Sequence, residues 1–365
     1  MADSGPISFA RGAPSYDIVN VEGLRSATRA AAEGELKWAT PYGSAAGFEP
    51  LREWIATRHG VDPTRVLVTN GSMQADAFLF AELVSPGTDV VIESPTYDRT
   101  LLGLRECGAT LHAVDLESDG INIEALRSLI EDDGVRPALA HILPTFHNPA
   151  GCTLSLAKRV ALLEIAAEYG ITVFEDDPYI DIRFTGEPLP RLLDLDKSGS
   201  VVYASSFSKT VCPGIRVGYL VAPQELAAAI TTRALNTYIS PSMLAQAVVY
   251  EFCASGEFER SVATVKAALA ERVAVLSASL RERLPEAAFV EPEGGYFLWV
   301  EFPQAIDSLR LTAAAKERGV IVTPGTEFTV DGGKHAVRIA YSGVGASEID
   351  EGVARLADAY HSLGQ

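Results

Sequence analysis

Residues 205–216 of this chain read SSFSKTVCPGIR, and an apolar run that begins at Val201 leads directly into them. Lys209 ends that run, where an ammonium group is costly to bury unless it is used or paired. Burial lowers the pKa of a lysine, and the neutral amine is then a nucleophile toward an aldehyde. The serine hydroxyls and Arg216 could hold a phosphate, because a guanidinium binds phosphate through two hydrogen bonds. A strand end exposed to solvent explains the same residues equally well, since short motifs often occur by chance.

Seven short apolar runs rich in β-branched residues indicate buried strands. They are Arg65–Asn70, Asp89–Ser94, Ala109–Leu116, Leu139–Phe146, Thr172–Asp177, Val201–Lys209 and Arg216–Pro223. Helical patterns lie between many of these runs, and the clearest is Ser155–Tyr169, with Ser155 as its N-cap and Gly170 just past its end. Strands that alternate with helices predict an α/β fold, in which a mostly parallel seven-stranded sheet lies between helices.

The pattern changes near Ser255, where a long Ala-rich amphipathic helix begins. The elements predicted after it are a strand (Tyr296–Phe302), a helix (Ser308–Arg318), two short strands (Val320–Thr323 and Ala336–Tyr341) and a final helix. Ser347 and Asp350 would form a capping box for that last helix. We therefore predict a large domain over residues 41–255 and a smaller α+β domain built from residues 1–40 and 256–365. The N-terminal segment is assigned to the smaller domain because it contains no strand of the large-domain type.

Three further polar clusters follow predicted strands of the large domain. Asp176 lies in the sequence EDDPY, and a carboxylate at a strand end can keep a pyridine nitrogen protonated. Asn148 lies in PTFHNPAG, and Ser72 lies in TNGSMQ, where the start of a helix offers free N–H groups to an anion. Each cluster alone is more simply a turn. Their coincidence at successive strand ends of one domain is much harder to produce by chance.

Composition excludes several classes of protein. The 365 residues carry a formal net charge of −18, which disfavours binding to nucleic acid. The four cysteines are widely spaced without a CxxC pair, so we expect no metal site and no disulfide framework. No apolar run is long enough to cross a membrane, and the first residues do not resemble a signal peptide. We therefore expect a cytoplasmic protein.

The order and spacing of the four clusters resemble those of the fold type I pyridoxal-phosphate-dependent aminotransferases of class I/II, the aspartate aminotransferase superfamily. The resemblance rests on the S-x-S-K-x(6)-R, Asn-Pro-x-Gly and Asp-x-Pro-Tyr motifs and extends from Ile7 to the last helix. Within that superfamily, the chain is most similar to the branch of kynurenine and 2-aminoadipate aminotransferases and of MocR-type effector domains. The motifs are specific for the fold and much less specific for the reaction.

The resemblance implies a role for each matching residue. Lys209 would hold pyridoxal 5′-phosphate as a Schiff base and shuttle a proton, and Asp176 would pair with the pyridine nitrogen. Tyr97 would stack on the ring, while Asn148 and Tyr179 would hydrogen-bond its phenolic oxygen. The residues expected to hold the phosphate are Ser72, Met73, Ser206, Ser208, Arg216 and, from a neighbouring subunit, Tyr42. That last contact would make the active site a property of a homodimer.

The resemblance also implies where substrate binds. Arg338, in the short apolar strand HAVRI, would clamp the α-carboxylate of an amino acid with the help of Asn148. From the residues alone, a structural salt bridge is the simpler explanation of a buried arginine. The chain departs from the family at Arg11-Gly12, where close relatives have two glycines, and at His147, where many members have Gln. Arg11 could contact a substrate side-chain carboxylate, although a surface position is slightly favoured.

The expected reaction is transfer of an amino group between an L-amino acid and a 2-oxo acid, with ping-pong kinetics. Elimination, decarboxylation or oxidation of an amino acid on the same cofactor can use the same residues, so the motifs leave these reactions open. A ligand-sensing module of the same fold is less favoured, because the chain is acidic and no helix-turn-helix precedes Ile7. The motifs do not identify the amino donor or the acceptor.

Overall fold

The computed structural model describes residues 5–33, 36–38, 40–303 and 305–363. The seven predicted strands of the large sheet are all present. They are β2 (Val66–Thr69), β3 (Asp89–Ser94), β4 (Thr110–Glu117), β6 (Leu139–Ile142), β7 (Thr172–Asp176), β8 (Val201–Ser206) and β9 (Gly218–Val221). An eighth strand, β5 (Gly120–Ile121), extends the sheet, whose order is β2-β9-β8-β7-β6-β3-β4-β5. The predicted number of seven is therefore one too low, because a strand of two residues leaves no pattern in the sequence.

Most neighbours in this sheet are parallel, as predicted. β4, β3, β6, β7 and β8 pair in parallel, whereas β9 is antiparallel to both β8 and β2. Consecutive residues face opposite sides, so Val90 and Ile92 pack on one face and Val91 on the other. Helices cover both faces, which leaves the parallel strands buried, as they are in other α/β sheets.

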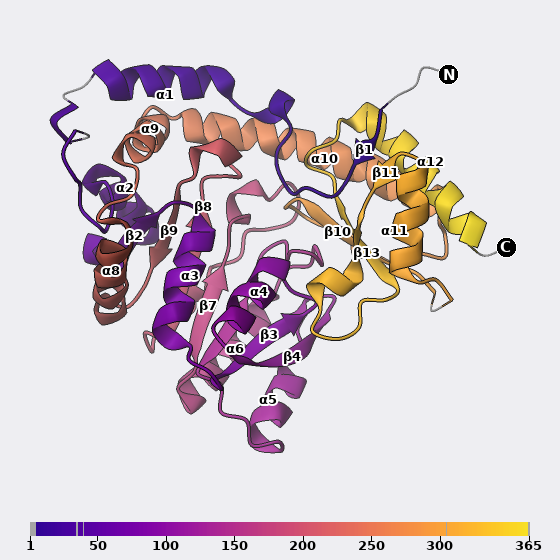
Figure 1. The fold of residues 1–365 in the computed structure, drawn as a ribbon, viewed down its shortest axis with the longest axis horizontal. Helices are drawn as coiled ribbons and strands as arrows, with labels where there is room; N and C mark the ends of the chain where they lie inside the picture. Colours follow the sequence, from indigo (N-terminus) through magenta and orange to yellow (C-terminus); the bar gives the residue numbers. More distant parts are fainter. Residues whose placement is uncertain (1–4, 34–35, 39, 304, 364–365) are drawn as a thin grey trace.

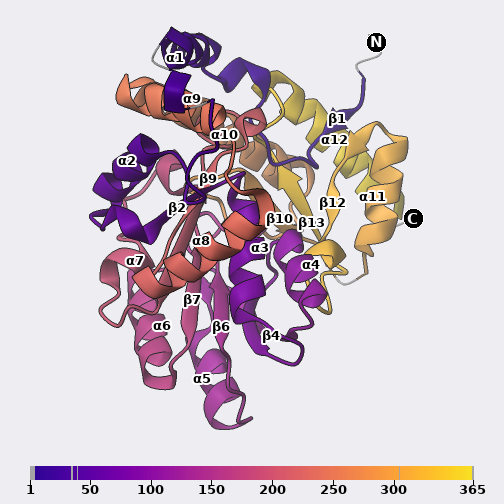
Figure 2. The same cartoon turned by 60° about the vertical axis from the view of Figure 1, so that its left-hand side comes forward.

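The helices divide between the two faces of the sheet (Figure 2). One face is covered by α3 (Ser72–Leu83), α4 (Asp98–Glu106) and α8 (Gln224–Tyr238). The other is covered by α2 (Glu49–His59), α5 (Ile123–Glu131), α6 (Leu156–Tyr169), α7 (Leu192–Leu195) and α9 (Met243–Ala254). The predicted boundaries of α6 are confirmed: Ser155 accepts a hydrogen bond from the N–H of Lys158, and Gly170 is left-handed with φ 68°.

The C-terminal segment forms the smaller α+β unit (Figure 1). Its elements are α10 (Glu257–Arg283), β10 (Phe297–Glu301), α11 (Ser308–Glu317), β11 (Val320–Ile321), β12 (Thr323–Pro324), β13 (Ala336–Ala340) and α12 (Ala346–Leu363). β10, β13 and β12 form an antiparallel sheet, whose apolar side chains pack against α10 and α12. The predicted capping box is wrong, because Ser347 lies inside α12 and Asp350 instead accepts hydrogen bonds from Ser279 and Arg283.

The N-terminal segment contacts both parts of the molecule. β1 (Ile7–Ser8) pairs in parallel with β11, as expected for the smaller domain. However, α1 (Val21–Glu33) lies along α9, and Ala27 and Ala31 are buried in the same cluster as Val66 of the large sheet (Figure 1). The described residues of this segment therefore pack partly against the large sheet, and the predicted boundary at residue 41 stays a prediction.

Short 3-10 helices complete the described chain, at Tyr16–Ile18, Leu36–Trp38, Pro63–Arg65, Ile180–Ile182, Pro213–Ile215 and Gly325–Phe328. Within the described residues, every helix is too short or too polar to cross a membrane.

Candidate active site

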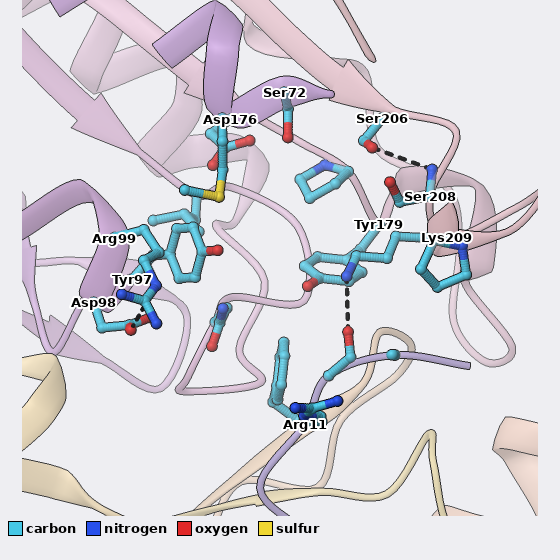
Figure 3. A pocket seen from close by; sticks show the side chains of 18 of the residues that line it. Arg11, Ser72, Tyr97, Asp98, Arg99, Asp176, Tyr179, Ser206, Ser208 and Lys209 are labelled. Atoms are coloured by element: carbon cyan, nitrogen blue, oxygen red, sulfur yellow. Dashed lines mark hydrogen bonds and ion pairs between the residues drawn. The ribbon is translucent and has the colours of Figure 1, made fainter. Parts of the chain in front are cut away.

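The polar clusters meet at one end of the large sheet, around a cavity of about 390 Å³. β6, β7 and β8 end there, and α3 and α4 begin there. Thirteen of the predicted site residues line the cavity: Arg11, Gly12, Ser72, Met73, Tyr97, Asn148, Asp176, Tyr179, Ser206, Ser208, Lys209, Arg216 and Arg338. Figure 3 shows Arg11, from the N-terminal segment, around the same space as the side chains from the region of the large sheet. The carboxyl ends of parallel strands share an edge, which explains why residues far apart in sequence converge.

Lys209 reaches the cavity from the loop after β8. Its Nζ donates a hydrogen bond to the carbonyl oxygen of Gly12 at 2.8 Å and lies 5.6 Å from the ring centre of Tyr179 (Figure 3). Burial and the charge of Arg338 lower the pKa of Lys209 to about 8, although Asp176 acts in the opposite direction. A substantial share of the amine is therefore neutral near physiological pH, as a nucleophile toward an aldehyde requires.

Asp176, the last residue of β7, faces the cavity from the sheet and is only 5% exposed. Burial raises its pKa to about 7, with a further contribution from Asp177. Its Oδ1 atom has no hydrogen-bond partner among the described residues. A buried carboxylate without a partner is costly. A protonated pyridine nitrogen would satisfy this oxygen, so Asp176 fits the ring of pyridoxal 5′-phosphate.

Two groups behind Asp176 were not predicted from the sequence. Burial raises the pKa of Asp76, on α3, well above its usual range, and the charge of Asp176 raises it further. His141, on β6, has Nε2 3.8 Å from Asp176, and burial lowers its pKa to about 3. His141 is therefore neutral. Asp76 left no signal, because an acid one turn into a helix usually lies on the surface.

The turn between β2 and α3 has the geometry of an anion site. Gly71 has φ 88°, and a Cβ atom there would lie 2.1 Å from the guanidinium of Arg216. Arg216 is exposed, and its guanidinium makes long hydrogen bonds to Ser208 Oγ and the carbonyl of Asn70, both at 3.4 Å, and to the carbonyl of Pro213 at 3.5 Å. Together with the free N–H groups where α3 begins at Ser72, it forms a site suited to an anion.

Arg338 approaches the cavity from β13. One guanidinium nitrogen donates to Asn148 Oδ1 at 3.1 Å and another to the carbonyl of Ala10 at 2.6 Å. The group lies between the rings of Phe297 and Phe328, at 4.5 and 4.6 Å from their centres. Among the described residues it has no acidic partner within ion-pair distance. The structural salt bridge that the sequence favoured is therefore not found, and the fork remains able to bind a carboxylate.

Three other positions singled out in the sequence are Gly12, His147 and Tyr42. Position 12 has no room for a side chain, because a Cβ atom there would lie 2.2 Å from the ring of Phe297. His147 lies behind the cavity, with Nδ1 accepting from the N–H of Ala150 at 3.2 Å and Nε2 3.2 Å from Glu93. Tyr42 does not line the cavity and is 80% exposed.

The cavity wall also contains residues that the motifs did not include. Asp98 and Arg99 begin α4, directly after Tyr97, and their side chains form an ion pair of 3.3 Å. Their position next to Tyr97 in the sequence could have indicated that they lie near the site. However, charged residues in the first turn of a helix are usually explained by their interaction with the helix dipole. The Asn148–Pro149 bond is cis.

Comparison with known proteins agrees with this geometry. A family model described as aminotransferase class I and II matches residues 4–356. The 2-aminoadipate transaminase of Thermus thermophilus is 31% identical over 98% of this chain and 91% of its own length. The aromatic-amino-acid aminotransferase 1 of Thermococcus litoralis is 28% identical over 97% of this chain and 88% of its own. The crystal structure of Pyrococcus horikoshii kynurenine aminotransferase has a TM-score of 0.94, with 31% identity over 98% of this chain and 91% of its own. The chain therefore belongs to the class I and II aminotransferases and is an enzyme that depends on pyridoxal 5′-phosphate.

Proposed function

We propose that this enzyme moves an amino group from an L-amino acid to a 2-oxo acid, with Lys209 as the residue that carries the proton. The observation that supports the proposal is the convergence of Lys209, Asp176 and Arg338 on one cavity. When bound, pyridoxal 5′-phosphate supplies a reactive aldehyde carbon and a ring that withdraws electrons. The chain must then hold that ring, orient the substrate and move one proton.

We assign each of these tasks to a residue of the cavity wall. Asp176 would hold a proton at the pyridine nitrogen, and Tyr97 would pack on the ring. Arg338, helped by Asn148, binds the α-carboxylate and so fixes the Cα atom near Lys209. The lowered pKa of Lys209 allows its neutral Nζ to accept a proton from Cα and to return it.

We further propose that two copies of the chain form a dimer, in which Tyr42 reaches the phosphate of the partner. Five large apolar side chains support this proposal, because they are between 46% and 80% exposed: Tyr42, Met73, Leu235, Ile239 and Leu244. Their segments are neighbours, since the N–H of Gly43 donates to Ser240 and α8 contacts α3. An exposed apolar region of this kind is typical of a protein interface.

Rapid mixing separates transfer from the other reactions of this cofactor. Cofactor-loaded enzyme is mixed with single L-amino acids while its visible absorbance is followed. Transfer predicts that the absorbance is lost, that a stoichiometric amount of 2-oxo acid is released, and that a second 2-oxo acid restores the signal. Continuous release of ammonia or carbon dioxide without an acceptor would instead indicate elimination or decarboxylation, and the proposed function would be wrong.

A further inference from the structure

The cavity contains more positive charge than the proposed reaction uses. Its wall carries five cationic and two acidic side chains: Arg11, Arg99, Lys209, Arg216, Arg338, Asp98 and Asp176. This positive wall belongs to a chain with a formal net charge of −18. In the proposed reaction, Arg216 binds the phosphate, Arg338 binds the α-carboxylate, and Lys209 is the reacting amine. The reaction assigns no role to Arg11 or Arg99.

The two remaining arginines differ in their surroundings. Arg99 has Nε 3.3 Å from Oδ2 of Asp98, so its charge is balanced within α4. The side chain of Arg11 has no hydrogen-bond or ion-pair partner within the described part of the chain. It is also exposed, so it is free to reorient toward a ligand.

The backbone on both sides of Arg11 is held by residues of the site. The carbonyl of Ala10 accepts a hydrogen bond from Arg338 at 2.6 Å, and the carbonyl of Gly12 accepts one from Lys209 at 2.8 Å. Arg11 therefore projects from a fixed point between the α-carboxylate clamp and the reacting amine. In Figure 3, Ser72 and Ser206 lie at the opposite side of the view, with Lys209 and Tyr179 between them and Arg11.

On the basis of the proposed transfer reaction, we infer that Arg11 binds the side-chain carboxylate of an acidic amino acid and of the matching 2-oxo diacid. A substrate with its α-carboxylate on Arg338 directs its side chain away from the phosphate site, toward the end of the cavity where Arg11 lies. The planar fork of Arg11 matches a second carboxylate. A neutral side chain would leave Arg11 in water at little cost, so the residue produces a preference for acidic substrates rather than exclusion of neutral ones.

Glutamate and glutamine test this inference, because they have nearly the same shape and differ in charge. Arg11→Gln should lower kcat/KM for L-glutamate roughly five- to tenfold, as expected for a charge-assisted contact at an exposed site. It should leave kcat/KM for L-glutamine unchanged. Arg11→Lys should restore part of the loss, because it keeps the charge without the fork.

Binding of unreactive acids gives a second measurement that does not depend on turnover. Glutarate and valerate have the same number of carbon atoms, but only glutarate has a second carboxylate. Calorimetric titration of the cofactor-loaded enzyme should show that Arg11→Gln weakens glutarate binding roughly five- to tenfold and leaves valerate binding unchanged. Equal weakening of both acids, or of neither, would overturn the inference.

Two further variants separate Arg11 from other sources of positive charge. Arg105→Gln removes the same charge from an exposed position on α4 outside the cavity, so it should keep the wild-type preference for glutarate. If Arg99→Gln abolishes that preference and Arg11→Gln does not, the assignment to Arg11 is wrong. A failure of the proposed function would give a different result from a failure of this inference. If the enzyme binds glutarate through Arg11 but transfers no amino group, the proposed reaction is wrong and the carboxylate site at Arg11 is supported.

Discussion

The pKa of Lys209 determines when this enzyme can take up its cofactor. Burial and the charges of Arg338 and Arg216 lower the pKa from 10.5 to about 8, while Asp176 acts in the opposite direction. The amine attacks an aldehyde only in its neutral form. Below about pH 8, the rate of covalent attachment to cofactor-free enzyme should therefore fall about tenfold per pH unit, and above it the rate should level off.

Stopped-flow absorbance after mixing cofactor-free enzyme with pyridoxal 5′-phosphate measures this rate. Asp176→Asn should move the midpoint to lower pH, because it removes the one charge that favours the ammonium form. A midpoint near the ordinary value of 10.5 would show that the surroundings of Lys209 do not desolvate it.

The proposed role of Arg338 in binding the α-carboxylate can be tested by a single substitution. Lysine keeps the charge but loses the planar fork, so Arg338→Lys should weaken transition-state binding of amino acids by about 1.5–3 kcal/mol, a roughly 10- to 100-fold loss in kcat/KM. Amines without an α-carboxylate should be affected much less. Steady-state kinetics on both substrate types measures the difference. An equal loss on both would mean that Arg338 acts by supporting Asn148 and Ala10 rather than by binding substrate.

At the scale of structural elements, the backbone of the turn between β2 and α3 requires glycine at position 71. Gly71→Ala would place a Cβ atom 2.1 Å from Arg216 at a position with φ 88°, so the guanidinium would be displaced from the phosphate site. The dissociation constant for pyridoxal 5′-phosphate should rise about tenfold or more, which corresponds to loss of one charge-assisted contact.

Gly60→Ala is the matched control, because Gly60 has φ 62° and an added Cβ atom there would meet no atom within 4 Å. Gly60 lies in the left-handed helical region, with ψ 34°, whereas Gly71 has ψ 158°, where alanine is more strained. Gly60→Ala therefore tests positive-φ strain of a milder kind, and it should lower stability by about 1 kcal/mol without changing cofactor affinity. Fluorescence titration with the cofactor and thermal unfolding separate the two effects. Equal cofactor affinity in both variants would mean that Arg216 can bind phosphate from another position.

For the whole molecule, the proposed dimer with shared active sites predicts complementation between two inactive variants. Lys209→Ala lacks the reacting amine, and Tyr42→Ala lacks the contact to the partner's phosphate. A hybrid dimer contains one site with both residues intact, so refolding the variants together should restore activity that neither has alone. Sedimentation should give twice the 38.9 kDa of one chain. No recovery in a confirmed hybrid dimer would place Tyr42 outside the partner's site.

The sequence by itself determined the elements of this protein and most of its cavity wall. Apolar periodicity reports burial within a segment, so it identified all seven long strands of the sheet. The motifs were recognisable because Asp176 must end a buried strand, and Lys209 and Asn148 must follow one, to reach the same edge of the sheet. The two-residue strand β5 left no such pattern and was missed.

Only the tertiary structure decided which distant side chains meet. Arg338 and Asn148 are 190 residues apart, and nothing local to either predicts their hydrogen bond. The same holds for the packing of α1 on α9 and for Asp76, whose burial depends on the sheet beneath α3. Periodicity encodes how much of a residue is buried but not what lies against it, because packing partners are selected by the whole folded chain. Arg11 is exposed as its sequence suggested, yet the fold places it at the cavity, between the carbonyl groups that bind Arg338 and Lys209.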